Sequence, residues 1–436
     1  MKKRIGLAAV LAAAATLAVV ATAAGKSSKH AAVTPLPASS CSKLQYGGKG
    51  SPQFIIASDL PLQGANRALP LEMNRAIAFI LKQQGWKAGK YTIGFQACDD
   101  STAQTGSWDS AKCTANANAY AQDKSVIGVI GTFNSGCAKL EIPINNRAPG
   151  GPIPMVSPSN TYPGLTVGGP GTAPGEPNVY YPTGKRNYAR VVWTDRFQGA
   201  ADAQFASKVL HLKKVYVLND KQTYGQGLAT LFSLAARKLG INILANNGWD
   251  ANATSYEAIA QGIKQAGADG VFIGGIVCNN GGKLLKDLRT VLGTSFPIIV
   301  PDGFTPFSAT VQTAGAAASG VYISYPGIPV TALKGAGKKF VKAFQRVNGG
   351  KLPDPYTAYA AQAAQVLLGA IAKSGGSRSG ATSHLTNLKV KNGILGSFSI
   401  NKDGDTTLGA VSIGRFNSTT AVFKQVITPP VSLTKG

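Results

Sequence analysis

The sequence predicts an α/β protein with two doubly wound parallel sheets. Short, almost wholly apolar runs alternate with segments of helical spacing, and the alternation restarts near residue 189. Apolar runs of this kind are typical of parallel strands that helices cover on both faces. A single sheet with so many strands would be unusually wide, so we interpret the chain as two sheets.

The first series of elements supplies the first sheet. Helical segments are recognised by apolar residues three or four positions apart. We expect strand 54–60, helix 71–81, strand 91–99, helix 111–122, strand 126–133, a short helix 137–145 and strand 153–159.

The second series follows the same rhythm. We expect strand 189–195, helix 200–209, strand 214–220, helix 228–239, strand 241–246, helix 255–266, strand 270–276, helix 283–292, and strands 297–303 and 320–326.

The N-terminus predicts export. A charged start, Lys2 to Arg4, precedes an apolar run over 5–20 and the small residues of 21–24. This pattern is typical of a signal peptide, and it is too short for a transmembrane anchor. We therefore expect a signal peptide over 1–24, a flexible tether over 25–51 and a soluble, extracytoplasmic mature protein, in the periplasm or at the cell surface.

The charge and the cysteines predict what kind of surface the protein has and which disulfide it forms. The chain has 44 Lys and Arg against 19 Asp and Glu, a formal net charge of +25, but the basic residues are dispersed. We interpret them as a solvated basic surface and not as a nucleic-acid site. Of the five cysteines we expect Cys98 and Cys113 to pair, because they flank one loop. A bond between Cys137 and Cys278 is possible as well, but it would link the two halves of the protein across the cleft between them and hinder its opening.

The sequence gives no support to catalysis. GxSxG, HExxH, a phosphate-binding GxxxxGK[ST] and a post-strand GxGxxG are all absent, and there are only three histidines. Without a CxxC motif a zinc site is not expected either. We predict no enzymatic activity, no metal and no cofactor.

Polar loops after the strands point to a ligand clamp instead. In open α/β sheets, ligands bind outside the carboxyl ends of the strands. Ser135 stands before a short helix, whose free N–H groups favour an anion, although it would also suit a helix cap. Thr161 and Asp302 follow other strands, and each could equally be a turn residue. Tyr224 could cover a ligand or merely pack.

Taken in order, these motifs resemble type I periplasmic binding proteins, specifically the leucine/isoleucine/valine-binding branch of ATP-driven importers. The resemblance runs from about residue 54 to 426. The matching stretches are "DLPLQG" (59–64), "CDDST" (98–102), "VIGTFNSG" (129–136), "SPSNTYPGLT" (157–166), "RVVWTDRFQG" (190–199), "VYVLNDKQTYGQGLA" (215–229), "GGIVCNNGGKLLKDLR" (274–289) and "VPDGF" (300–304).

The resemblance implies a set of ligand-binding residues. A serine and backbone amides of one loop would hold the ligand carboxylate, and Asp302 would hold its ammonium group. A usually aromatic position is Ile276 here, which leaves the side-chain pocket open. The region from Pro149 to Arg186 looks longer than in the family. The implied residues are Phe133, Asn134, Ser135, Ser159, Asn160, Thr161, Tyr224, Ile276 and Asp302.

The resemblance also implies the domain plan and the function. The lobes would comprise 52–194 with 327–396, and 195–326 with 397–430, joined by three crossings and ending in a hairpin that turns at 401–405. The function would be the capture of an amino acid, most readily an aliphatic one, by a monomer that delivers it to membrane permease subunits. Binding of another small polar ligand such as an amide, or a sensory role, are the alternatives.

Overall fold

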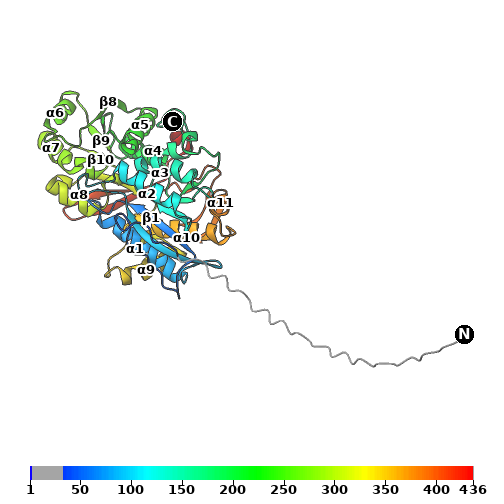
Figure 1. Ribbon diagram of the computed structural model, residues 1–436. Coiled ribbons are helices and arrows are strands. Elements are labelled where there is room, and N and C mark those ends of the chain that lie inside the picture. Colours follow the sequence, from blue (N-terminus) through cyan, green and yellow to red (C-terminus); the bar gives the residue numbers. More distant parts are fainter. Residues whose placement is uncertain (2–32, 436) are drawn as a thin grey trace. The chain divides into compact units, whose positions relative to one another are not determined.

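The computed structural model describes residue 1 and residues 33–435 of the chain. The predicted signal peptide, apart from Met1, lies outside these residues. Among the described helices, none is both long and apolar enough to cross a bilayer. The elements named below are labelled in Figure 1 where space allows.

The first sheet is parallel except at one edge. All six residues of its strand β4 are buried, as expected for an apolar strand covered on both faces. Only β2 runs antiparallel, against β3. In spatial order the six strands are β2 (Lys87–Ala88), β3 (Tyr91–Asp99), β1 (Phe54–Leu60), β4 (Val126–Gly131), β5 (Met155–Ser157) and β6 (Tyr188–Arg190).

The second sheet has a parallel part and an antiparallel edge. Its last two strands reverse direction: β14 pairs antiparallel with β11, and β15 with β14. In spatial order the seven strands are β15 (Ala421–Ile427), β14 (Val411–Phe416), β11 (Tyr322–Pro326), β10 (Ile298–Val300), β9 (Gly270–Gly274), β7 (Lys214–Asn219) and β8 (Asn242–Gly248). A separate hairpin joins β12 (Leu388–Gly393) to β13 (Gly396–Ile400).

Helices pack on both sheets. The most buried one, α10, is alanine-rich and apolar on nearly every side, because it packs against α1 as well as against β4 and β5 (Figure 1). The helices are α1 (Ala68–Gln83), α2 (Ser110–Gln122), α3 (Ser135–Asn146), α4 (Asp195–Lys208), α5 (Thr223–Lys238), α6 (Glu257–Gln265), α7 (Gly282–Leu292), α8 (Phe307–Ala314), α9 (Gly335–Val347), α10 (Pro355–Ala372), α11 (Arg378–Ser383) and α12 (Val431–Thr434).

Three segments connect the elements of the two sheets: one after β6, one after β11 and one between β13 and β14. Hydrogen bonds bring all three together. The Trp193 indole and the Gly327 N–H both donate to the Ala410 carbonyl, at 2.7 and 2.9 Å. The lobe boundaries at 195, 327 and 397 remain a prediction.

The expected terminal hairpin turns elsewhere. Residues 401–405 do form a tight turn, closed by a bridge between Ile400 and Thr406. However, the last hairpin is β14–β15, and it turns at 417–420, where the Asn417 N–H donates to the Thr420 carbonyl at 2.8 Å.

The predicted tether is wrong for the part of it that is described. Leu36 and Cys41 are buried, and the Leu36 N–H donates to the Gln96 side chain at 2.7 Å. Cys41 and Gln45 form antiparallel bridges with β3 beyond the short strand β2. The segment therefore covers a sheet edge that would otherwise present unpaired backbone groups.

The expected bond between Cys98 and Cys113 is also wrong. Cys98 is bonded to Cys41, and Cys113 to Cys137, which leaves Cys278 as a free thiol. The prediction was wrong because it placed Cys41 in a flexible tether, away from the other cysteines. In the fold, Cys41 lies beside β3, and Cys113 on α2 faces Cys137 on α3.

Candidate functional site

The topology of both sheets directs attention to their carboxyl ends. In the first sheet the strand order reverses at β1, which has β3 on one side and β4 on the other. In the second it reverses at β7, between β8 and β9. Such switch points open a crevice between loops, where ligands bind.

One cavity lies among these loops. It encloses about 310 Å³ of space not filled by protein atoms, open solvent included. Eight of the nine predicted residues line it; only Asn160 does not. The lining residues are Phe133, Asn134, Ser135, Ser159, Thr161, Tyr224, Ile276, Asp302, Gly303 and Tyr356.

One side of the cavity is the start of α3. Asn134 occupies the cap position but makes no side-chain cap bond, so the alternative of Ser135 as the cap does not hold. The Ser135 hydroxyl instead accepts a 3.3 Å hydrogen bond from the Tyr162 N–H. Because the first N–H groups of a helix lack intrahelical partners, this end is suited to an anion.

The opposite side carries a buried carboxylate. Asp302 follows β10, and its Oδ1 accepts a 2.6 Å hydrogen bond from the Tyr224 hydroxyl. Its Oδ2 accepts a hydrogen bond from Tyr356, the second residue of α10. Burial raises the pKa of Asp302, and the hydrogen bonds from the two phenols oppose that rise. Its carboxylate thus faces the cavity and is not used up in a local turn.

Asn160 supports the site from outside the cavity. Its side-chain amide donates to the Phe133 carbonyl at 2.9 Å, and its carbonyl oxygen accepts from the Tyr188 hydroxyl at 3.1 Å. It therefore ties the loop after β5 to the loop after β4. Ser159 adds a 3.3 Å bond to the same Phe133 carbonyl.

Sequence reasoning missed two lining residues. Tyr356 is the second residue of α10, and its ring packs against Phe133 with centroids 5.7 Å apart. No strand-end pattern marks it, so nothing in the sequence pointed to the cavity. Gly303 is required by space: a Cβ there would lie 2.2 Å from the Gly275 carbonyl oxygen.

One buried carboxylate holds part of the long region from Pro149 to Arg186. Glu176 accepts hydrogen bonds from the Tyr162 hydroxyl at 2.6 Å and from Tyr180, and it pairs with Lys139 at 3.2 Å. Burial alone would raise the pKa of Glu176, but the phenols, the Ala173 N–H and Lys139 lower it below the usual range. Tyr162 directly follows Thr161, so this region is joined to the site.

Among the described residues, Asp100, Cys113 and Cys137 form the one group of potential metal ligands with closely spaced donor atoms. The two sulfurs are bonded to each other. They therefore offer no thiolates to a metal ion.

Comparison with known proteins identifies the family of this chain. A family model described as periplasmic binding protein matches residues 98–421, well over half of the chain. The chain belongs to the periplasmic binding protein family. The resemblance inferred from the sequence is thereby confirmed, and the family consists of extracytoplasmic solute-binding proteins.

Curated relatives of this periplasmic binding protein are distant. An amino acid binding protein of Pseudomonas aeruginosa is 28% identical over 265 residues, 61% of this chain and 64% of that protein. The chain thus spans slightly less than two thirds of that relative. A Leu/Ile/Val-binding protein homolog of Brucella abortus is 26% identical over 77% of this chain and 82% of its own length.

Solved structures share the fold of this periplasmic binding protein. A leucine-binding protein of Thermotoga maritima superposes with a TM-score of 0.73 at 24% identity, covering 86% of this chain and 99% of its own. A solute-binding protein of Rhodopseudomonas palustris in complex with benzoate gives 0.69 at 18% identity, covering 86% and 96%. The predicted fold class is confirmed.

Proposed function

We propose that this protein is the solute-binding component of an ABC importer and captures an amino acid between two closing lobes. The observation that carries the proposal is the opposition, across one cavity, of a helix N-terminus with Ser135 and a buried carboxylate, Asp302. A zwitterion presents complementary groups to both sides.

The two ends of the ligand would be recognised differently. The N–H groups at the start of α3, with the Ser135 and Thr161 hydroxyls, would bind the carboxylate. Asp302 would accept the ammonium group, with its position fixed by Tyr224 and Tyr356. Closure of the lobes over the ligand would exclude water and strengthen both contacts.

The rest of the lining favours an apolar side chain. Phe133 and Ile276 offer hydrocarbon surface, and the cavity is small. An aliphatic amino acid is therefore the first candidate. The named relatives from Pseudomonas and Brucella, described as amino acid and Leu/Ile/Val binders, support this choice.

An aromatic carboxylate is the second candidate. The benzoate-bound relative has the same fold, and Phe133, Tyr224 and Tyr356 give the cavity an aromatic wall. Asp302 argues against it, because benzoate offers no cation to a buried carboxylate. An amide ligand, or a sensory role in place of transport, would involve the same binding residues, the start of α3 and Asp302.

Thermal unfolding with a ligand panel tests the proposal. Purified mature protein, expected to be monomeric, is unfolded alone and with each amino acid, leucinamide, benzoate, and representative sugars, nucleotides and metal ions at matched concentration. A ligand at about 100 times its Kd adds roughly 2.7 kcal/mol of stability. Stabilisation by at least one aliphatic amino acid is expected. Stabilisation by benzoate alone, or only by sugars, nucleotides or metals, would overturn the amino-acid assignment.

A further inference from the structure

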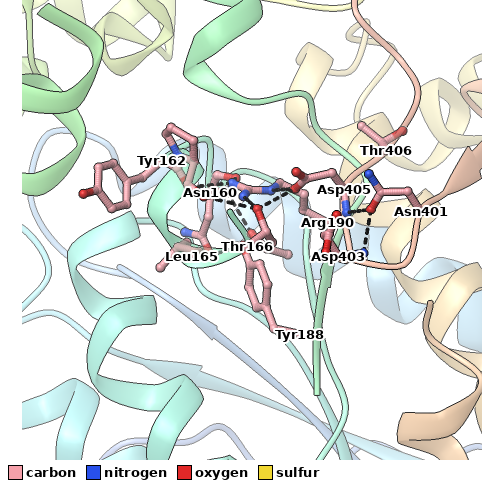
Figure 2. Close-up of polar contacts among 12 residues, drawn as sticks. Asn160, Tyr162, Leu165, Thr166, Tyr188, Arg190, Asn401, Asp403, Asp405 and Thr406 are labelled. Atoms are coloured by element: carbon pink, nitrogen blue, oxygen red, sulfur yellow. Dashed lines mark hydrogen bonds and ion pairs between the residues drawn. The ribbon is translucent and has the colours of Figure 1, made fainter. Parts of the chain in front are cut away.

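Arg190 is a fully buried cation at the end of β6, in contact with the loop that carries Thr161 (Figure 2). Its Nη1 donates to the carbonyl oxygens of Asn160 and Tyr162, both at 2.9 Å. These two residues flank Thr161, which lines the cavity. The guanidinium therefore fixes the backbone on both sides of one cavity residue.

The remaining nitrogens of Arg190 hold other parts of the chain. Nε pairs with Asp405 Oδ1 at 2.8 Å, and Nη2 donates to Thr166 Oγ1 at 2.5 Å. Asp405 belongs to the turn 401–405, where its N–H donates to the Asn401 side chain at 3.0 Å (Figure 2). Its carboxylate is the counter-ion of Arg190 but does not contact the Asn160 or Tyr162 carbonyls.

The contact between Arg190 and the Asn160 carbonyl also affects the Thr161 N–H, because both groups belong to one peptide unit. The Asn160 carbonyl and the Thr161 N–H belong to the same planar group, and in a trans peptide they point in opposite directions. A cation at the carbonyl end polarises the unit and makes the N–H a stronger donor. Within the described residues, no acceptor is bonded to the Thr161 N–H.

We propose that Arg190 is a positioning residue for the ligand carboxylate. It holds Thr161 through the two flanking carbonyls, and it polarises the peptide group so that the Thr161 N–H is a stronger hydrogen-bond donor. This rests on the proposed function insofar as the ligand is a carboxylate. Asp405 neutralises the guanidinium and accepts a 2.8 Å hydrogen bond from the Thr166 hydroxyl, but it makes no hydrogen bond to Asn160, Thr161 or Tyr162.

Two variants separate this role from simple stabilisation. Arg190→Gln removes both carbonyl contacts and the charge, whereas Asp405→Asn breaks the ion pair and leaves the carbonyl contacts. Three quantities are measured for each: the Tm without ligand, the Kd for the amino acid that most stabilises the wild type, and ligand-free hydrogen exchange over 158–166.

Both variants should lower the Tm. Only Arg190→Gln should weaken binding, by at least about tenfold, the loss typical of one charge-assisted hydrogen bond. Only this variant should speed exchange over 160–162, because Asp405 contacts the segment at Thr166 and not at these residues. Asp405→Asn should stay within about threefold of the wild-type Kd.

A folded Arg190→Gln protein with wild-type affinity would overturn the proposal, and so would an Asp405→Asn protein that loses as much affinity. If Arg190→Gln does not fold, Arg190→Lys replaces it; Lys keeps the charge but not the forked geometry, and undiminished affinity there would also overturn it. A wild type that responds to no amino acid refutes the proposed function alone. The exchange measurement then still decides, because unchanged exchange over 160–162 excludes the positioning role.

Discussion

At the residue scale, the site depends on how Asp302 is held. Its two carboxylate oxygens accept phenol hydrogens from Tyr224 on α5 and Tyr356 on α10. These two helices pack on different sheets. The same carboxylate can thus contact a ligand cation and join the two sides of the cavity.

Replacing Asp302 should therefore abolish tight binding. Loss of one partner of a buried, hydrogen-bonded charge pair costs about 2–5 kcal/mol, which corresponds to roughly thirtyfold or more in Kd. Calorimetric titration of Asp302→Ala measures this effect. Ser135→Ala is the comparison, and it should lose less because the helix N–H groups remain. An unchanged Kd in a well-folded Asp302→Ala protein would remove this residue from the site.

Tyr356 offers a milder test of the same contact. Tyr356→Phe keeps the ring packed against Phe133 and removes only the hydroxyl that bonds Asp302. One hydrogen bond to a charged group contributes about 1.5–3 kcal/mol, so the Kd should rise roughly tenfold or more. Tyr359→Phe, one helical turn further along α10, is the matched control and should bind like the wild type.

At the element scale, the region from Pro149 to Arg186 shows what a sequence pattern can miss. Its many glycines and prolines predict a surface loop, yet Glu176 is buried and is bonded by two phenols, one N–H and Lys139. This carboxylate thus adds a buried polar centre to a region that also packs Leu165, Tyr180 and Tyr181 into a hydrophobic cluster.

Removing that carboxylate should loosen the region and not the sheets. Breaking a buried charge pair by deleting one partner costs about 3–5 kcal/mol, so Glu176→Ala should lower the Tm by several degrees. Limited proteolysis should then cut within 167–186, where the wild type resists. A Glu176→Ala protein as stable and as resistant as the wild type would contradict this assignment.

The parallel strands and most cavity residues were predictable, because both follow from local order; β2 and the hairpin β12–β13 were not predicted. Apolar runs mark buried strands, and a polar residue at a strand's carboxyl end lies at the crevice, as Ser135, Thr161 and Asp302 do. Tyr356 was not predictable, since its place depends on how α10 packs. The cysteine pairs were missed for the same reason: the segment at Cys41 shows no strand alternation, but it bridges β3.

At the scale of the whole molecule, several buried carboxyl groups form no ion pair with a basic side chain in the described part of the chain. Asp100 and Asp195 are fully buried, and none of their carboxyl oxygens has a hydrogen-bond partner among the described residues. Burial raises the pKa of each well above its usual value. Burial also raises the pKa of Asp220 to about 6. At a pH between its unfolded and folded pKa values, such a group is protonated in the fold and ionised in the unfolded chain.

The sign of the pH dependence follows from these shifts. A carboxyl whose pKa is raised by folding stabilises the fold below the unfolded pKa, and the contribution is lost as the pH rises through the folded pKa. The protein should therefore be more stable at pH 5 than at pH 7.5. Asp220 alone should account for roughly 1 kcal/mol of the difference. Urea unfolding at constant ionic strength measures it, and Asp220→Asn should flatten the slope. Greater stability at pH 7.5 would contradict the prediction.

The disulfides have a consequence for how the chain matures. In order along the chain the cysteines are 41, 98, 113, 137 and 278, and the first bonds the second while the third bonds the fourth. A chain that emerges from its N-terminus and is oxidised on the way therefore meets the correct partner at each step. The free thiol arrives last, after both bonds can close. The observed pairing is therefore the one that sequential oxidation from the N-terminus would produce.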